Sequence, residues 1–573
     1  MQPNHRNRKV SRVPLRAGAL ASLISYLAVG HAVEVVPEAG SILRNIKPES
    51  ILPGNSQVPF EISEQPAPAG ESDIRIQVKG WKISGAVLIS EADLQSFLKD
   101  YIGKDLNLLE LRKITRDIAA YYQQRGFFAR ALLPAQQIRD GIVEILIREA
   151  TLGKVEVDDS ANTYRNDIPR QTMLAAQPAG EALRLADMQR GILLLNDLTG
   201  GTVSSTLKAG ARAGESDLLL KIDPSNLISG SVDYSNTGVR SVGMNQFGGS
   251  LNLNNPLRLG DLATLRVQGG SGNVYGRVAY SLPVGYSGLR VGLAASALDY
   301  TLGEPFQSLD AQGSAWTGGT FATYPLLRGV STNLYVASGF DDRHYYNTSL
   351  ASVVSDKEVQ SGYVGLSGDH QDDWLGGAVT LFGATMVAGN LDLSGSPVDQ
   401  AQNRATARAG GAYQKFSLNA SRLQGLTDKL RLYAGFSGQL ATKNLDSSEK
   451  FSLGGPFGIR AYPVNEALGD EGYLMNFELR YEVYEHVELV GFIDHGGITL
   501  HNDLWSNATE GVPNHYTLSG GGVGINWTVP GNFVIRGSVA QRIGANPARS
   551  TDGNDSDGTY KTPHFWVSLS KAF

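Results

Sequence analysis

The chain has 573 residues, no cysteine and a formal net charge of -6. The absence of cysteine excludes a disulfide framework, thiol chemistry and any metal site with cysteine ligands. The acidic charge balance gives no reason to expect a nucleic-acid partner. The length predicts more than one domain.

The N-terminal segment has the pattern of a secretory signal peptide. Residues 1–16 carry five basic side chains and no acidic one, and residues 17–30 are apolar but too short to cross a bilayer. Small residues follow, with a cleavage site expected after Ala32. We therefore expect a signal peptide over residues 1–32 and export of the mature chain from the cytoplasm. The alternative is a buried N-terminal helix.

The next segment predicts one short helix and a connection. "PEAGSILRNI" (37–46) allows one or two helical turns, so residues 33–46 predict a helix. Residues 47–72 are polar and contain five prolines, at Pro48, Pro53, Pro59, Pro66 and Pro68. Prolines at this spacing indicate an extended linker.

Residues 73–225 predict the same small unit twice. In residues 73–150, a strand at 74–85 precedes two helices, whose starts carry capping patterns at Ser90 and Asn107. Strands at 127–134 and 141–149 close this unit. Residues 151–225 repeat the order β-α-α-β-β less clearly. A repeated unit of this kind predicts two copies of one α+β domain in tandem.

From residue 226 onward the chain alternates as strands. In "YLMNFELRYEV" (473–483) the apolar side chains fall on one face, and the polar side chains Asn476, Glu478, Arg480 and Glu482 fall on the other. Alternation alone fits either a soluble sandwich or a membrane barrel.

The lengths of the connections between strands distinguish a soluble sandwich from a membrane barrel. We count about sixteen strands, an even number, and their connections alternate between short and long. Tight turns at one rim and long loops at the other are typical of outer-membrane barrels. The predicted fold is thus α+β domains followed by a 16-stranded antiparallel transmembrane β-barrel over residues 226–573. The long connections are predicted at 301–312, 341–355, 389–404, 441–471, 500–515 and 544–561.

One long connection carries a candidate ion pair. The loop segment "GGPFGIRAYPVNEALGDEGY" (454–473) is rich in Gly and Pro and contains Arg460. In "GFIDHGG" (491–497), strand parity points Asp494 into the barrel lumen. A lumenal carboxylate shielded from water needs a partner, and an arginine can bind it with two hydrogen bonds. The alternative is an exposed loop arginine and an unrelated strand aspartate.

These segments, with "GFFARALLPAQQIRDGIVEILIRE" (126–149) and "NNPLRLGD" (254–261), resemble those of two-partner secretion transporters. That family comprises outer-membrane translocators of haemolysin- and filamentous-haemagglutinin-type exoproteins, within the outer-membrane assembly-factor superfamily. The resemblance implies a signal peptide (1–32), a plug helix (33–46), a linker (47–72), two POTRA domains (73–150 and 151–225) and the barrel (226–573).

The resemblance also implies roles for single residues. In the family the sixth loop folds back into the barrel and carries a characteristic arginine. This implies a loop anchor made of Arg460 and Asp494 with Gly458 and Tyr462. The chain departs from the family pattern at Ala461, where glycine is usual.

A strand at a sheet edge can take up an extended client through main-chain hydrogen bonds. In the first repeat the candidate edge comprises Ala129, Arg130, Ala131, Leu132 and Leu133. The alternative is a purely structural edge, since edge strands are common.

The expected function is export of an unfolded exoprotein, recognised by the POTRA domains, through the barrel without ATP. Expected partners are a haemolysin-, adhesin- or contact-dependent-inhibition-type client, outer-membrane lipid, and periplasmic chaperones and barrel-assembly machinery during biogenesis. A general barrel-assembly factor or a passive porin is the alternative. We find no nucleophile–base set, and "DGNDSDG" (552–558) lacks the last acid of a calcium loop. We therefore expect no enzymatic activity, no cofactor and no metal.

Overall fold

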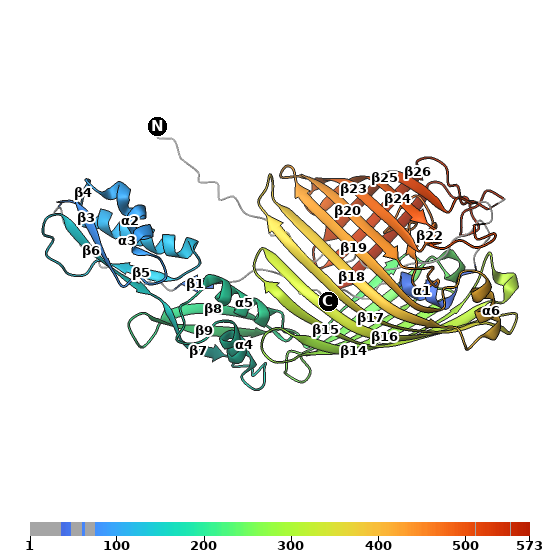
Figure 1. Cartoon of the computed structure of the whole chain (residues 1–573), viewed down its shortest axis with the longest axis horizontal. Coiled ribbons are helices and arrows are strands. Elements are labelled where there is room, and N and C mark those ends of the chain that lie inside the picture. Colours follow the sequence, from blue (N-terminus) through green and yellow to red (C-terminus); the bar gives the residue numbers. More distant parts are fainter. Residues whose placement is uncertain (1–35, 47–59, 63–74, 510–511, 551) are drawn as a thin grey trace.

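The structure is a computed structural model that describes residues 36–46, 60–62, 75–509, 512–550 and 552–573. The predicted signal peptide and most of the predicted linker lie outside the described residues. Two small α+β repeats lie side by side beyond one end of a large barrel (Figure 1).

The first repeat contains a three-stranded sheet in the order β3-β6-β5 with two helices. Its buried residues include Leu94, Ile118 and Ile145, which pack between the helices and the sheet. The expected strand over residues 74–85 is wrong as one element, because it breaks at Val78. Its first part pairs with β4, and its second part pairs with β6. The elements are β2 (Ile76–Gln77), β3 (Gly80–Ser84), α2 (Glu91–Leu98), η2 (Lys99–Tyr101), β4 (Asp105–Leu106), α3 (Leu108–Gln124), β5 (Ala129–Leu132) and β6 (Ile142–Glu149).

The second repeat has a four-stranded sheet in the order β1-β8-β9-β7. Its outermost strand, β1 (Phe60–Ile62), comes from the predicted linker. Its own segments follow the predicted order β-α-α-β-β, and the first helix, α4, starts at Ile168 with a proline in its first turn. The elements are β7 (Thr151–Asp158), α4 (Ile168–Ala176), α5 (Leu185–Asn196), β8 (Gly201–Ala209) and β9 (Glu215–Pro224).

Sixteen antiparallel strands form a closed barrel, which confirms the predicted strand number and pairing. The last strand closes the barrel against the first through five residue pairs, from Ser231 opposite Ala572 to Ser235 opposite Ser568. The strands are β10 (Ile228–Ser235), β11 (Gln246–Asn254), β12 (Leu262–Gly269), β13 (Asn273–Pro283), β14 (Arg290–Thr301), β15 (Gln312–Arg328), β16 (Thr332–Ser349), β17 (Ser352–Asp372), β18 (Ala378–Asp392), β19 (Gly411–Gly425), β20 (Leu430–Ala441), β23 (Glu471–Tyr484), β24 (Val487–Thr499), β25 (His515–Val529), β26 (Phe533–Arg542) and β27 (His564–Ala572).

One predicted long loop is wrong. Residues 341–355 form the ends of β16 and β17, joined by a tight turn at Leu350 and Ala351. Both residues have positive φ, 49° and 60°, as a two-residue hairpin turn requires. The sequence offered neither Gly nor Asn at these positions, so the turn was not recognisable.

The other long connections contain short elements. α6 (Pro397–Ala405) follows β18, and the connection between β20 and β23 holds the two-stranded ladder of β21 (Phe451–Ser452) and β22 (Leu468–Gly469). Two 3₁₀ turns, η3 (Arg240–Val242) and η4 (Gln307–Leu309), lie between barrel strands. Among the described residues no helix combines the length and apolar character needed to cross a membrane.

A short helix, α1 (Ala39–Asn45), lies inside the barrel near the end that is farther from the two repeats (Figure 1). Its buried residues Ala39 and Ile42 belong to one cluster with inward-facing side chains of the wall, including Leu298 and Tyr345. The barrel interior is therefore packed around this helix.

Candidate functional site

The connection between β20 and β23, residues 442–470, folds into the barrel and is named the inner loop here. Its backbone turns tightly: Ile459 N–H donates to Leu453 O at 2.7 Å, and Gly455 N–H donates to Tyr462 O at 3.1 Å. A side chain at Gly458 would put its Cβ 2.0 Å from Leu453 O. Only glycine fits at this turn, which sets the position of the next two residues.

Arg460 at the tip of this turn binds the strand aspartate that the sequence predicted as its partner. Arg460 Nε donates to Asp494 Oδ2 at 2.9 Å, and Nη2 donates to Asp494 Oδ1 at 2.7 Å. The backbone N–H of Arg460 donates to Asp494 Oδ2 at 3.0 Å. The carboxylate on β24 is fully buried. This bidentate geometry, with an added main-chain bond, is one that lysine could not reproduce.

Four further residues contact Arg460 or its partner Asp494, and the sequence prediction did not assign them to this site. Arg460 Nη1 donates to Glu478 Oε1 at 2.6 Å, and the guanidinium lies 3.5 Å from the centroid of the Phe492 ring. Asn476 Nδ2 donates to Asp494 Oδ1 at 2.8 Å. Trp566 Nε1 donates to the Arg460 carbonyl at 2.7 Å. Glu478 and Asn476 lie on the polar face of residues 473–483, and that face was the available sequence signal for their contacts.

Charge is balanced within this group. Glu478 accepts hydrogen bonds from both Arg460 and Arg480, the latter from Nε at 2.8 Å. Two arginines therefore face two carboxylates, Glu478 and Asp494, in a partly dehydrated site. Removing Arg460 leaves the buried Asp494 carboxylate without its counterion, which is costly.

Tyr462 and Ala461 pack into an apolar seat on the barrel wall. Both are fully buried in a cluster that includes Leu453, Val490 and Leu518. Arg542 also lies over the Tyr462 ring, 4.9 Å from its centroid. The inner loop is thus held by apolar contacts as well as by Arg460.

The departure from the family pattern at Ala461 has a structural counterpart on β25. A Cβ placed on Gly520 would lie 2.5 Å from the Ala461 Cβ. The wall has no side chain where the loop has its methyl group, so the two surfaces fit. The φ of Ala461 is not among the positive values of the described residues, so the backbone does not require glycine there.

The helix α1 contacts both the inner loop and the wall. Arg44 Nη1 donates to Ser447 O at 3.0 Å, and Nη2 donates to Asn465 Oδ1 at 2.9 Å. Preceding the helix, Glu38 forms an ion pair of 2.6 Å with Lys357 of β17. Lys357 also pairs with Asp446 of the inner loop at 3.0 Å. The helix and the loop are therefore parts of one plug.

The predicted client edge in the first repeat is the outer strand β5, beside α3. β5 includes Ala129, Arg130, Ala131 and Leu132, and Leu133 lies just beyond it. Ala150 N–H donates to Phe128 O, and antiparallel pairs alternate along a ladder. The amides of Arg130 and Leu132 therefore face β6, and those of Ala129 and Ala131 face the free edge.

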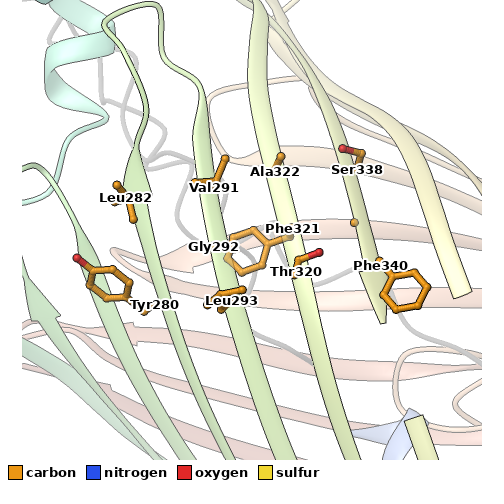
Figure 2. A pocket seen from close by; sticks show the side chains of 11 residues that line it. Tyr280, Leu282, Val291, Gly292, Leu293, Thr320, Phe321, Ala322, Ser338 and Phe340 are labelled. Atoms are coloured by element: carbon orange, nitrogen blue, oxygen red, sulfur yellow. The ribbon is translucent and has the colours of Figure 1, made fainter. Parts of the chain in front are cut away.

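A groove of about 600 Å³ lies on the outer wall over β13 to β16 (Figure 2). Its lining includes Leu293 and Phe340, which are exposed and have the strand parity opposite to that of the inward-facing Leu298. The groove faces away from the lumen and is lined by apolar and hydroxyl side chains. It therefore lies apart from the plug. Among the described residues, no three His, Asp or Glu side chains are grouped to hold a metal ion.

Comparison with known families identifies this architecture. Residues 214–527 match the haemolysin secretion/activation protein ShlB/FhaC/HecB family, and residues 76–150 match the POTRA domain of ShlB type. The chain belongs to this secretion family. It is an outer-membrane transporter of the two-partner secretion type, and its POTRA region lies on the periplasmic side.

Relatives of the transporter extend over most of its length. The heme/hemopexin transporter protein HuxB of Haemophilus influenzae is 28% identical over 491 residues, which cover 84% of each chain. The outer membrane transporter CdiB of Escherichia coli is 26% identical over 517 residues, covering 83% of this chain and 81% of CdiB.

Solved structures show the same fold. CdiB from Escherichia coli superposes with a TM-score of 0.65 at 22% identity and covers 89% of this transporter and 93% of that chain. BamA from Haemophilus ducreyi lacking POTRA domains 1-3 gives a TM-score of 0.52 at 14% identity, with 87% and 100% covered.

Replacing Arg460 tests the role of the loop anchor. We expect Arg460→Ala to release the inner loop while the barrel still assembles, because it strands Asp494 at a cost of about 3–5 kcal/mol. Arg460→Lys should release the inner loop less than Arg460→Ala does and more than the wild-type chain does. Limited proteolysis measures release of the inner loop. The heat-dependent shift of the barrel in gel electrophoresis measures its assembly. Arg431→Ala, which removes a strand-to-strand ion pair with Glu482, is the matched control. Equal protection of the loop in all variants would contradict the anchor role.

The fit between loop and wall predicts a reciprocal pair of substitutions. Gly520→Ala should loosen the inner loop, because its Cβ would collide with that of Ala461. The double variant Gly520→Ala with Ala461→Gly should restore protection of the loop from protease, because the methyl group has only changed sides. If Ala461→Gly does not restore protection in the Gly520→Ala variant, the contact between positions 461 and 520 does not determine how the inner loop packs on the wall.

Proposed function

We propose that this transporter captures an unfolded exoprotein in the periplasm through its POTRA region and passes it through the barrel to the cell surface or the medium. The observation that carries the proposal is the plug. The lumen of a closed barrel is filled by α1 and the inner loop, which non-covalent contacts hold in place inside it. Such segments can leave or shift without opening the barrel wall.

In this proposal the loop anchor keeps part of the plug in place during export. Arg460 and Asp494 with Gly458 and Tyr462 keep the inner loop seated while the helix α1 and the parts of the loop that contact it yield to the client. Folding of the exoprotein outside the cell would draw transport forward, so the process needs no ATP. We propose no catalytic role for the chain and no cofactor.

Relatives suggest the kind of client. HuxB is named a heme/hemopexin transporter, and HpmB of Proteus mirabilis, 23% identical over 231 residues, is named a hemolysin transporter. For this chain we propose a client of the haemolysin, adhesin or contact-dependent-inhibition type. A passive porin would need neither two periplasmic repeats nor a plug made of two segments.

Co-expression with candidate exoproteins tests the export proposal. We expect one of them to appear in the culture medium, or on the cell surface, only when the transporter is present. Heat-modified migration confirms that the barrel is inserted, and periplasmic extracts show any retained client. Client found solely in the periplasm, with a properly inserted barrel, would contradict the proposal.

The free edge of β5 predicts a selective effect of proline. Ala131→Pro removes an amide that faces outward, so it should weaken client binding by roughly tenfold, about one main-chain hydrogen bond, and leave the sheet intact. Ala131→Ser keeps the amide and is the control. Binding of the client's N-terminal segment to the full transporter is measured by fluorescence anisotropy. Unchanged affinity in Ala131→Pro would exclude β5 as the docking edge.

A further inference from the structure

The last connection of the barrel turns back onto the inner loop. β26 ends at Arg542 and β27 begins at His564, and the connection between them is named the outer loop here. It lies at the end of the barrel that is farther from the two repeats (Figure 1). Two of its polar side chains, Asn546 and Asp555, are only 5% and 2% exposed. The outer loop therefore buries polar groups inside the protein at this end.

Glu466 of the inner loop accepts the hydrogen bonds of the outer loop. Asn546 Nδ2 donates to Glu466 Oε1 at 2.5 Å, and the backbone N–H of Ser556 donates to Glu466 Oε2 at 2.8 Å. Asn546 Nδ2 also donates to Asp555 Oδ1 at 3.2 Å, so one amide group bridges two carboxylates. These four residues are named the carboxylate clasp here.

The segment "DGNDSDG" (552–558) forms the outer side of the clasp. Gly558 N–H donates to Asp555 O at 2.9 Å, which closes a tight turn. Arg240, in the connection between β10 and β11, donates from Nη1 to Asp557 O at 2.9 Å and holds this turn in place. A segment that lacks the last acid of a calcium loop thus has a different role, which is to present the Asp555 carboxylate to the inner loop.

Charge is not balanced in the clasp. Arg542 of β26 forms an ion pair with Asp555. No cation bonds to Glu466 within the described part of the chain, and its two partners are an amide group and a backbone N–H. Burial first, and the Asp555 carboxylate second, raise the pKa of Glu466 to about 7. Ionisation of Glu466 therefore works against the contact that it makes.

Other charged and titratable groups surround the two carboxylates. Burial raises the pKa of the Tyr462 hydroxyl to about 12, so it stays neutral near pH 7. Histidine has an ordinary pKa of about 6.5, so His564 is the competing origin of a response near neutral pH. Besides Arg542, the groups are Tyr462 of the inner loop, Tyr516 of β25, Arg549, Asp557, Tyr560 and Lys561 of the outer loop, and His564 of β27.

We propose that the carboxylate clasp is a pH-sensitive closure of the outer loop, and that Glu466 is its positioning residue. With Glu466 protonated, one negative charge faces Arg542 and the clasp stays closed. With Glu466 ionised, it repels Asp555 and regains water when the outer loop is released. The closed clasp is therefore most stable in acid, and this stabilisation is lost as the pH rises through about 7.

The importance of the clasp for export rests on the proposed function. The inner loop is part of the plug, and the client would leave the barrel at the end where the outer loop lies. A closed clasp fixes the outer loop to the plug at that end. Release of the clasp frees the outer loop to move aside, as in other switches that respond to protonation. Export should therefore increase as the external pH rises.

Distances between two nitroxide labels measure the position of the outer loop without a client, and the cysteine-free chain makes the labelling specific. Asp552→Cys is exposed on the outer loop, outside the clasp, and Gln360→Cys is exposed on β17, on the opposite side of the barrel. Pulsed electron paramagnetic resonance of the purified full chain gives the populations with closed and displaced outer loops. We expect the ratio of displaced to closed molecules to rise about tenfold from pH 6 to pH 8.

Three variants separate Glu466 from its neighbours. Glu466→Gln removes the charge and keeps one acceptor oxygen, so the ratio should be the same at pH 6 and pH 8. Glu466→Ala removes both acceptors, so the outer loop should be displaced at both pH values. His564→Gln is the matched control, because it removes the competing titratable group and should keep the full response to pH.

The distance measurements decide the clasp by themselves. An equal ratio at pH 6 and pH 8 in the wild-type chain overturns the proposal. A response that persists in Glu466→Gln, or one that disappears in His564→Gln, overturns it as well, because the titrating group is then not Glu466.

Export is measured separately, as release of the exoprotein that the wild-type chain exports from cells held at pH 6 and at pH 8. We expect release to increase with pH for the wild-type chain and not for Glu466→Gln. Equal pH dependence of the two overturns the role of the clasp in export, while the export function stands. Absence of export by the wild-type chain at both pH values overturns the export function, and the distance measurements still decide the clasp.

Discussion

The buried contact between Arg460 and Asp494 is the constraint on which the interior of the barrel depends. A carboxylate with no exposed surface on β24 requires a cation, and the cation is supplied by a loop rather than by a neighbouring strand. The loop must therefore enter the lumen and turn sharply at Gly458 to present the guanidinium. Once the loop is inside, it offers Ser447 and Asn465 to the Arg44 side chain of α1. Wall, loop and helix thus form a series of contacts in which each part positions the next.

The contacts in this series differ in kind, and this difference suits a channel that must open. The loop tip has bidentate, main-chain and apolar contacts with the wall, so its seat is strong. The helix has seven residues. Ala39 and Ile42 pack against the wall, Arg44 binds the inner loop, and Glu38 just before the helix pairs with Lys357. A short helix has little stability of its own. The weaker element therefore lies in the path of a client, and the stronger one defines the channel's shape.

Much of this architecture could be predicted from the sequence, because a barrel imposes alternation, strand number and loop sorting on the whole chain. The Arg460–Asp494 contact was also predictable, from strand parity and an unusual loop together with the resemblance of both segments to the family. The roles of Glu478 and Trp566 were not, since they depend on which strands become neighbours after closure. The turn at Leu350 and the pairing of β1 with β8 lacked local signals for the same reason. Tertiary contacts impose the positive φ of Leu350 and Ala351. They also determine the three-residue ladder between β1 and β8.

The lengths of the barrel strands have a consequence for the membrane around the protein. β15, β16 and β17 have 17, 18 and 21 residues, well above the roughly 10 that cross a bilayer. β10, β11 and β12 have eight or nine. The wall is therefore tall on one side and low on the other. Lipid beside the low side has to thin to match it, and an emerging polypeptide meets a raised rim on one side and an open approach to the lipid headgroups on the other.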